Sequence, residues 1–316
     1  MGLLKRGLSN LKKDPLVSIL TIFRGVINNI KDKRIAKSIA IRKEELLRNS
    51  DKLFGVNSDF EAYIEYIKRN DISTFNSDFE REYQNNICVD IHKDGLYKYV
   101  NHFNKKLYFP WYYKFTEISK IYKTLLMEQD IDSPHKYIDC EDNLNNCIFF
   151  DCGSAEASLP LEIVDKVKKL YLFEADKKWI KPLSKTFAPW KDKVIIENKY
   201  VSNCDSNTAI SLGNYIRKLV IEEQVNLEVD NIFIKMDIEG FEEIVFADII
   251  SLLKEAKNMH IAVCAYHKKD AEKNIVNMLP ENYAAKARNG YMLFLYQEDG
   301  FEFPYFRRGV LRIERS

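Results

Sequence analysis

The feature that most limits how this chain can fold is a regular alternation of short apolar segments with amphipathic ones after residue 146. The apolar segments have the length of buried strands, and helical periodicity fills the stretches between them. Such alternation is typical of βαβ units and a parallel sheet. The expected strands are 147–151, 169–174, 194–197, 231–237 and 260–266.

A pair of residues with a strong turn preference follows these segments. Asn289 and Gly290 separate two further apolar segments, 283–288 and 291–297. Asn-Gly is typical of a two-residue β-hairpin, because both central positions of that turn need positive φ. We therefore predict an α/β fold in which a parallel sheet is closed by an antiparallel C-terminal hairpin.

The chain before residue 137 lacks this alternation and is predicted to be a mainly helical appendage. Apolar residues recur at helical spacing over 14–48, and Ser58 and Glu61 have the spacing of a capping box that opens a second helix. Gly95 marks a small hairpin. The other elements expected here are strands over 87–92, 96–101 and 107–109 and a helix over 111–128. We predict two domains, 1–136 and 137–316.

Aromatic residues are dense just before this predicted boundary. Most should pack, but one or two could form a stacking surface for a sugar. We predict that the region 1–136 covers the substrate or serves oligomerisation. The aromatic residues concerned are Tyr97, Tyr99, Phe103, Tyr108, Phe109, Trp111, Tyr112, Tyr113 and Phe115.

Positive charge is concentrated at the start of the chain. Residues 1–48 carry twelve Lys and Arg against four Asp and Glu, whereas the whole chain has a net charge of only +1. The remainder is mildly acidic, which argues against a dedicated nucleic-acid binder. The amphipathic segment 14–48 is expected to pack on the body of the protein or on a second subunit of a homo-oligomer. The alternative for 1–48 is a basic peripheral anchor on an anionic membrane, which we do not favour.

The six cysteines are scattered, without a C-x-x-C pair or a histidine spacing that suits zinc. We therefore expect free thiols, no metal site and a reducing, cytoplasmic setting. The apolar stretch 15–23 ends at Arg24, short of the roughly 20 residues that cross a bilayer. Neither a signal peptide nor a transmembrane helix is expected.

Two acidic strand ends indicate a nucleoside site. Asp151 ends the first strand ahead of Gly153, a turn that is common by itself as a strand-to-helix connection. Glu174 ends the second strand, where a carboxylate can accept hydrogen bonds from ribose hydroxyls. The G-x-G-x-x-G string that binds a pyrophosphate is absent, so a nucleoside without phosphates, such as S-adenosylmethionine, is expected. The predicted cofactor contacts are Asp151, Gly153, Ser154, Glu174, Ala175, Val201, Ser202 and Asp237.

The most specific string runs over 232–242, where an apolar strand carries Lys235, Asp237 and Glu239 at alternate positions. Residues two apart share one face of a strand. Because a buried lysine is costly unless a carboxylate neutralises it, Lys235 is expected to pair with Asp237, Glu239 or another acid at the carboxyl ends of the strands. Open α/β sheets bind ligands at these ends.

The next strand delivers His267 beside Asp237. We expect His267, Asp237, Glu239 and Lys235 to form the catalytic group, with His267 as the first choice for a general base and Asp237 as its orienter or a substrate anchor. The alternative is structural: Asp237 would pair with Lys235, and His267 would bind the backbone.

These strings resemble the FkbM family of S-adenosylmethionine-dependent methyltransferases over roughly residues 137–297. The family's hallmark, Lys-x-Asp-(Val/Ile)-Glu-Gly-x-Glu, is matched without a mismatch over 235–242. Three further strings look like family motifs: Phe150-Asp151-Cys152-Gly153, Phe173-Glu174-Ala175 and Ala265-Tyr266-His267-Lys268. The resemblance implies a Rossmann-like methyltransferase fold.

The chain departs from the family pattern at four positions. Ala155 and Ala157 stand where members usually have Asn and Gly, and Gly213 stands where an Asp often begins a helix. Pro160 falls within the first expected helix, so that helix should start late, with Ser158 as its expected cap.

The resemblance implies O-methylation of a small-molecule or glycan acceptor. For this chain we expect a hydroxyl of a sugar in a bacterial surface polysaccharide or its nucleotide-activated precursor. A non-catalytic binding or scaffold protein on the same fold is the alternative, because fold alone does not determine function.

Overall fold

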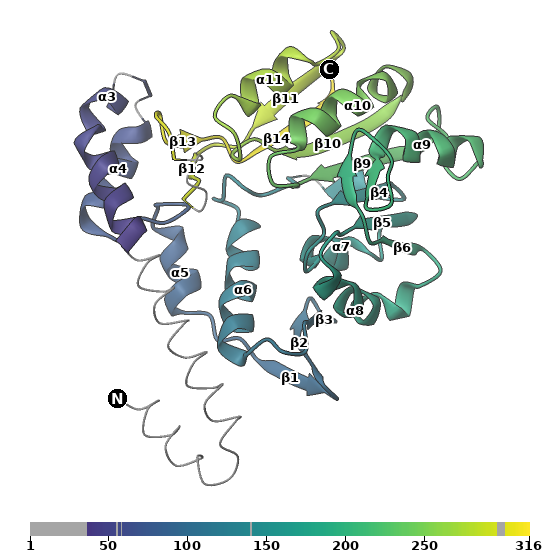
Figure 1. Ribbon diagram of the computed structural model, residues 1–316, viewed down its shortest axis with the longest axis horizontal. Coiled ribbons are helices and arrows are strands. Elements are labelled where there is room, and N and C mark those ends of the chain that lie inside the picture. Colours follow the sequence, from purple (N-terminus) through teal and green to yellow (C-terminus); the bar gives the residue numbers. More distant parts are fainter. Residues whose placement is uncertain (1–36, 55, 58, 140, 296–300) are drawn as a thin grey trace. The chain divides into compact units, whose positions relative to one another are not determined.

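The computed structural model describes residues 37–316 except 55, 58, 140 and 296–300 (Figure 1). The chain divides into two compact units between Ser73 and Thr74. In the first unit, residues 37–48 are helical and are followed by α3 (Ser50–Phe54) and α4 (Asp59–Arg69). The predicted helical segment before residue 37 and the predicted cap at Ser58 lie outside the described residues.

The second unit contains the sheet together with residues 74–136, which the sequence assigns to the appendage. That residues 1–136 cover the substrate or serve oligomerisation, while residues 137–316 form the catalytic domain, stays a prediction. Among the helices of the described ranges, none combines the length and the apolar character needed to cross a membrane.

Seven strands form the main sheet, in the order β11-β14-β10-β9-β4-β5-β6. Strands β4, β5, β6, β9 and β10 run parallel, and β14 lies antiparallel between β10 and β11. A parallel sheet closed by an antiparallel C-terminal strand is the predicted Rossmann-like methyltransferase fold. The bounds are β4 (Ile148–Cys152), β5 (Lys169–Phe173), β6 (Val194–Glu197), β9 (Asn231–Met236), β10 (Asn258–Cys264), β11 (Tyr283–Ala287) and β14 (Val310–Arg315).

The prediction of a hairpin closed by Asn289 and Gly290 was wrong. β11 pairs with β14, whereas β12 (Met292–Leu293) pairs outside the main sheet with β13 (Phe306–Arg307). The guanidinium of Arg308 donates to the carbonyl oxygens of Arg288 and Gly290 at 3.3 and 3.2 Å. The chain after this turn therefore leaves the main sheet and returns to it at β14. Strand β14 lies beside β11, and its buried apolar residues pack on both faces of the sheet.

Side chains that alternate along the central strands pack into two separate cores. Phe149 stacks on Phe233 at 5.1 Å on one face, while Phe150 stacks on Tyr171 at 4.9 Å on the other. Figure 1 shows α7 and α8 on the first side and α9 and α10 on the second. The helices are α7 (Ser158–Ile163), α8 (Lys177–Thr186), α9 (Leu212–Ile221), α10 (Glu242–Glu255) and α11 (Ala271–Asn277).

Residues 74–136 add a small antiparallel sheet and two helices to this unit. The sheet packs on α7 and α8: the backbone N–H of Tyr108 donates to Thr186 Oγ1 at 3.0 Å, and Phe109 contacts Trp179. β1 pairs antiparallel with β2, with Asp94 opposite Tyr97, which confirms the predicted hairpin at Gly95. Trp111 and Tyr112 are more than half exposed, so not every aromatic residue of this segment packs. The elements are α5 (Phe79–Asn85), β1 (Ile91–Asp94), β2 (Tyr97–His102), β3 (Lys105–Phe109) and α6 (Phe115–Glu128).

The remaining elements are short connections. A two-stranded parallel pair that the sequence did not indicate follows β6. The bounds are η1 (Glu141–Leu144), η2 (Ala188–Trp190), β7 (Tyr200–Ser202) and β8 (Ala209–Ser211).

Candidate functional site

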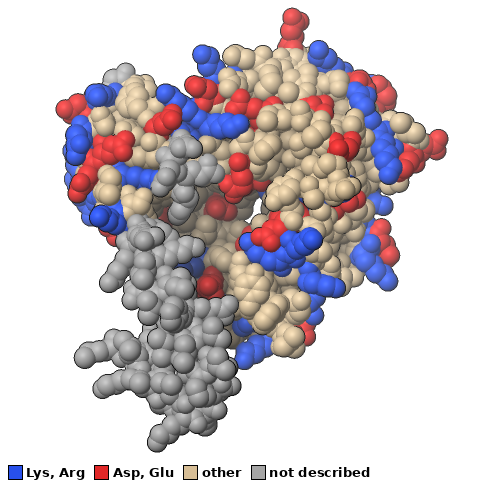
Figure 2. All heavy atoms as spheres, in the orientation of Figure 1, with Lys and Arg blue, Asp and Glu red and all other residues tan. Residues whose placement is uncertain are grey.

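A cavity of about 1000 Å³ lies at the carboxyl ends of β4, β5 and β9, with α6 as one wall. Its lining residues all belong to the unit 74–316. Lys and Arg atoms are interspersed with Asp and Glu atoms over the described part of one face, and Asp and Glu atoms are visible inside a hollow near its centre (Figure 2). All eight predicted cofactor contacts line the cavity, as do Lys235 and Glu239, whereas His267 does not.

The loop after β4 needs glycine at position 153 because the chain passes against its own backbone there. A Cβ on Gly153 would lie 1.9 Å from the carbonyl oxygen of Asp237, and its φ is +81°. The N–H groups of Gly153 and Ser154 both donate to the carbonyl oxygen of Phe173. These small residues therefore hold the ends of β4, β5 and β9 together, rather than exposing N–H groups to a ligand.

Two alanines in the same loop are held in the left-handed region. Ala155 has φ +42° and Ala157, the N-cap of α7, has φ +56°. Helix α7 begins at Ser158, as expected from Pro160, but the cap is Ala157 and makes no side-chain hydrogen bond. Asn and Gly tolerate this conformation better than alanine does, which explains why the departures at these positions matter.

Glu174 is fixed by the backbone on both sides. Its Oε2 accepts from the N–H of Ala155 at 2.7 Å, and its Oε1 accepts from the N–H of Asp176 at 2.6 Å. Burial raises the pKa of Glu174, although these backbone hydrogen bonds oppose the rise. Each carboxylate oxygen keeps a second lone pair for a hydroxyl donor from the cavity.

Lys235 pairs with an acid on the neighbouring strand. Its Nζ lies 3.0 Å from Asp151 Oδ1 and donates to the carbonyl oxygen of Gly153 at 2.7 Å. Burial lowers the pKa of Lys235, but the charges of Asp151 and Asp237 outweigh this effect and raise it overall. Lys235 is thus a fixed cation. Its partner is Asp151, and not Asp237 or Glu239, the two acids that sequence analysis named.

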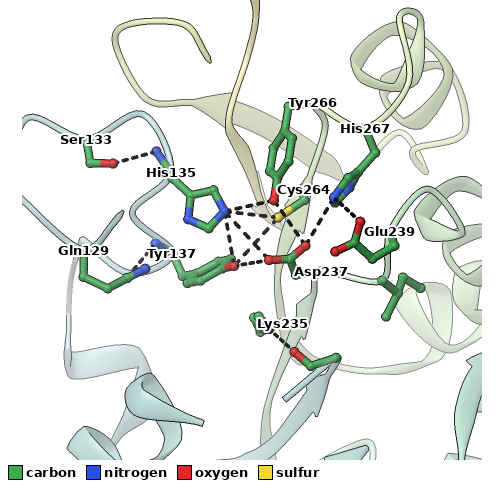
Figure 3. A network of polar contacts seen from close by, with 12 residues as sticks. Gln129, Ser133, His135, Tyr137, Lys235, Asp237, Glu239, Cys264, Tyr266 and His267 are labelled. Atoms are coloured by element: carbon green, nitrogen blue, oxygen red, sulfur yellow. Dashed lines mark hydrogen bonds and ion pairs between the residues drawn. The ribbon is translucent and has the colours of Figure 1, made fainter. Parts of the chain in front are cut away.

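Asp237 is the centre of a buried polar network (Figure 3). Tyr137 donates its hydroxyl to Asp237 Oδ2 at 2.7 Å, and Tyr266 donates to Oδ1 at 3.3 Å. Figure 3 shows Tyr137 and His135 approaching Asp237 from one side and His267 from the other. Burial alone would raise the pKa of Asp237, but Lys235, the two histidines and the Tyr137 hydrogen bond hold it at about 2.

These hydrogen bonds also assign the tautomer of His135. Its Nε2 lies 3.3 Å from the Tyr266 hydroxyl and 3.4 Å from the Tyr137 hydroxyl. Both hydroxyl protons are already donated to Asp237, so Nε2 must carry the hydrogen of His135. Burial lowers the pKa of His135 to about 4, which keeps the ring neutral.

His267 lies behind Asp237, between two carboxylates. Its Nε2 is 3.5 Å from Asp237 Oδ1, and its Nδ1 forms an ion pair with Glu242 Oε1 at 2.9 Å. Burial lowers the pKa of His267, but Glu242, Asp237 and Glu239 together raise it above its ordinary value. The last Glu of the hallmark string therefore binds the predicted histidine.

Several cavity residues were not predicted from the sequence. Glu128, in the last turn of α6, and Glu156, after β4, both line the cavity. Burial raises the pKa of Glu128 to about 8, with the charges of Asp237 and Glu156 adding to it, and raises that of Glu156 to about 7. His135 and Tyr137 were missed as well. Of the residues that were not predicted, only Tyr266 could have been found from the sequence, since it precedes His267 in the family-like string Ala265-Tyr266-His267-Lys268.

Comparisons with known proteins give distant likenesses only. No protein-family model matches the sequence, and no curated protein matches it. The methyltransferase FkbM from Methylobacillus flagellatus KT is 14% identical over 64% of this chain, with a TM-score of 0.37, and the match spans 55% of that protein. Magnesium protoporphyrin IX methyltransferase from Synechocystis PCC 6803 is 15% identical, with a TM-score of 0.38 and coverages of 65% and 86%. Precorrin-6y C5,15-methyltransferase from Geobacter metallireducens GS-15 is 12% identical, with a TM-score of 0.34 and coverages of 55% and 82%. These likenesses are too distant to transfer a function.

Proposed function

We propose that this chain is an S-adenosylmethionine-dependent methyltransferase that methylates a hydroxyl of its acceptor. The observation that supports this most is that one cavity is lined both by Glu174, after β5, and by Asp237, after β9, the two strands on either side of β4. Glu174 would hold the ribose hydroxyls, and Asp237 would face the acceptor hydroxyl near the sulfonium. A volume of about 1000 Å³ lies at the upper end of the range usual for ligand sites, so the cavity is large enough for two ligands bound together.

The reaction needs alignment and the removal of one proton. The acceptor oxygen would attack the methyl carbon, the bond from carbon to sulfur would break, and S-adenosylhomocysteine would leave, while the hydroxyl proton would pass to the carboxylate of Asp237. Alignment contributes most, because holding two reactants in line can supply about 7–11 kcal/mol in the best intramolecular cases. Asp237 would orient the hydroxyl directly, with His267 supporting it from behind.

The acceptor that we propose is a sugar of a bacterial surface polysaccharide or its nucleotide-activated precursor. This rests on the resemblance of residues 235–242 to the FkbM hallmark. The wall formed by α6, which lies before residue 137, would select the acceptor.

Calorimetry with S-adenosylhomocysteine tests the proposal. We expect binding at micromolar concentration, and we expect Glu174→Ala to weaken it by more than about 1 kcal/mol, since two charge-assisted hydrogen bonds would be lost. The absence of heat at high micromolar ligand would contradict the proposal and favour a non-catalytic scaffold.

A further inference from the structure

We propose that Asp237, Glu239 and His267 form a binding site for one divalent metal ion of the Mn²⁺ type, with Glu242 supporting the histidine. Its role in catalysis rests on the proposed function, but its existence does not. Sequence analysis expected no metal site, because it considered only the spacing of the cysteines and histidines.

The distances suit a shared ion. His267 Nε2 lies 3.5 Å from Asp237 Oδ1 and 3.8 Å from Glu239 Oε2. Two ligand atoms bound about 2.2 Å from one ion lie roughly 3–3.6 Å apart, so only small side-chain movements are needed. The possible ligand atoms of Asp237, His267 and Glu242 lie within 4.8 Å of one another. The Glu239 side chain is 78% exposed and has room to turn.

Glu242 has the position of a carboxylate that orients a metal-binding histidine. Its Oε1 faces His267 Nδ1 at 2.9 Å and accepts from the N–H of Ile238 at 2.9 Å. A metal-binding histidine commonly donates its other ring N–H to a carboxylate, which fixes the ring and directs its free nitrogen at the metal. Here that free nitrogen is Nε2, which points toward Asp237.

The charges around the ring favour a cation. Three carboxylates, those of Asp237, Glu239 and Glu242, surround the imidazole of His267. The nearby cation, Lys235, is held by Asp151.

The backbone supports the same conclusion. Glu239 has φ +56°, in the left-handed region that a glutamate seldom adopts. Strained positions of this kind gather at functional sites, where the side chain is needed despite its conformational cost. In this conformation the Glu239 carboxylate lies 3.8 Å from His267 Nε2.

A second group of possible ligands is already filled by a side chain. His135, Asp237 and Cys264 also have ligand atoms within 4.8 Å of one another. The Tyr137 hydroxyl, however, lies 3.4 Å from His135 Nε2, 2.7 Å from Asp237 Oδ2 and 3.9 Å from Cys264 Sγ. It occupies the place that an ion would take, so this group carries a hydrogen-bond network.

The site opens to the cavity through Asp237 and Glu239. Mn²⁺ accepts carboxylate oxygen and also tolerates imidazole, whereas softer metals prefer nitrogen and sulfur. An acceptor hydroxyl bound at an open position would be held in line and made more acidic. Its proton would pass to the ionised carboxylate of Asp237 as the oxygen attacks the methyl carbon and the bond from carbon to sulfur breaks.

Titration of the metal-stripped full chain with Mn²⁺ tests the site, with the free ion measured by electron paramagnetic resonance. We expect one ion per chain. His267→Gln and Glu239→Gln should each weaken binding at least about tenfold, since each loses a ligand. Asp270→Asn, a change of an exposed acid three residues after His267, should leave it unchanged.

A wild-type chain that binds no Mn²⁺, or variants that bind it as tightly as the wild type, would overturn the proposal. S-adenosylhomocysteine binding, measured on the same samples without added metal, reports separately on the proposed function.

Discussion

The two ends of the cavity are built in different ways. The end with Glu174 consists of strand ends and the loops directly after them, and its contacts are mostly to backbone: Glu174 accepts from Ala155 and Asp176. The end with Asp237 consists of charged and hydroxyl side chains from distant segments, including Tyr137 and Tyr266. The first end can hold a ligand by shape and hydrogen bonding. The second concentrates buried charge, which is suited to chemistry on a bound group.

The largest effect is expected at the Asp237 end. Asp237→Asn and His267→Ala should each lower methyl transfer at least about a hundredfold, because the first changes the carboxylate that we propose faces the acceptor oxygen and the second removes the ring behind it. Turnover and S-adenosylhomocysteine affinity are measured together, and affinity should stay within a few fold. Near-normal turnover in both variants would move attention to Glu239 and Glu128.

A smaller effect, on stability, is expected at Glu242. Glu242→Ala should lower the free energy of unfolding by about 2–3 kcal/mol, since it leaves the N–H of Ile238 and the ring of His267 without their buried partner. Glu243→Ala, which removes an exposed hydrogen bond to Asn274, is the matched control and should cost less than about 0.5 kcal/mol. Equal losses in urea unfolding would show that Glu242 has no special role.

The difference between the two ends also decided what could be predicted from sequence. All eight predicted cofactor contacts line the cavity. Six of them lie at the ends of β4, β5 and β9 or directly after these strands, and parallel strands bring their carboxyl ends to one edge, whereas Val201 and Ser202 lie in β7. Glu128 and His135 escaped prediction because nothing in the local pattern shows that α6 and the segment after it lie across that edge. The strand β14 was missed for the same reason, since its pairing with β10 and β11 is long-range.

The raised pKa of Glu128 gives a pH-dependent prediction. A carboxyl whose folded pKa of about 8 exceeds its unfolded value costs stability as pH rises between those values. Glu128→Gln removes this cost. Its advantage in unfolding free energy over the wild type should therefore grow by at least about 1 kcal/mol from about pH 5.5 to about pH 8.5. An advantage that is constant with pH would show that Glu128 is not titrating in the cavity.

The smallest effect concerns the left-handed alanines at the cofactor end. Ala157→Gly should raise the free energy of unfolding by roughly 0.5–1 kcal/mol, because glycine adopts φ +56° without strain. The control is Ala247→Gly, on the exposed side of α10, where the same replacement should lower it by about 1 kcal/mol. Thermal unfolding of both variants measures whether each replacement raises or lowers stability. Destabilisation by Ala157→Gly would contradict the left-handed backbone conformation at position 157.

The most direct test of a cavity with a cofactor end and an acceptor end compares two variants by calorimetry with S-adenosylhomocysteine. Glu174→Gln keeps the size of the side chain but loses its charge, and should weaken binding at least about tenfold, or roughly 1.4 kcal/mol. Asp237→Asn, an equally conservative change at the other end, should stay within about threefold of the wild type. Unchanged affinity in Glu174→Gln, together with a large loss in Asp237→Asn, would contradict the assignment of the two ends.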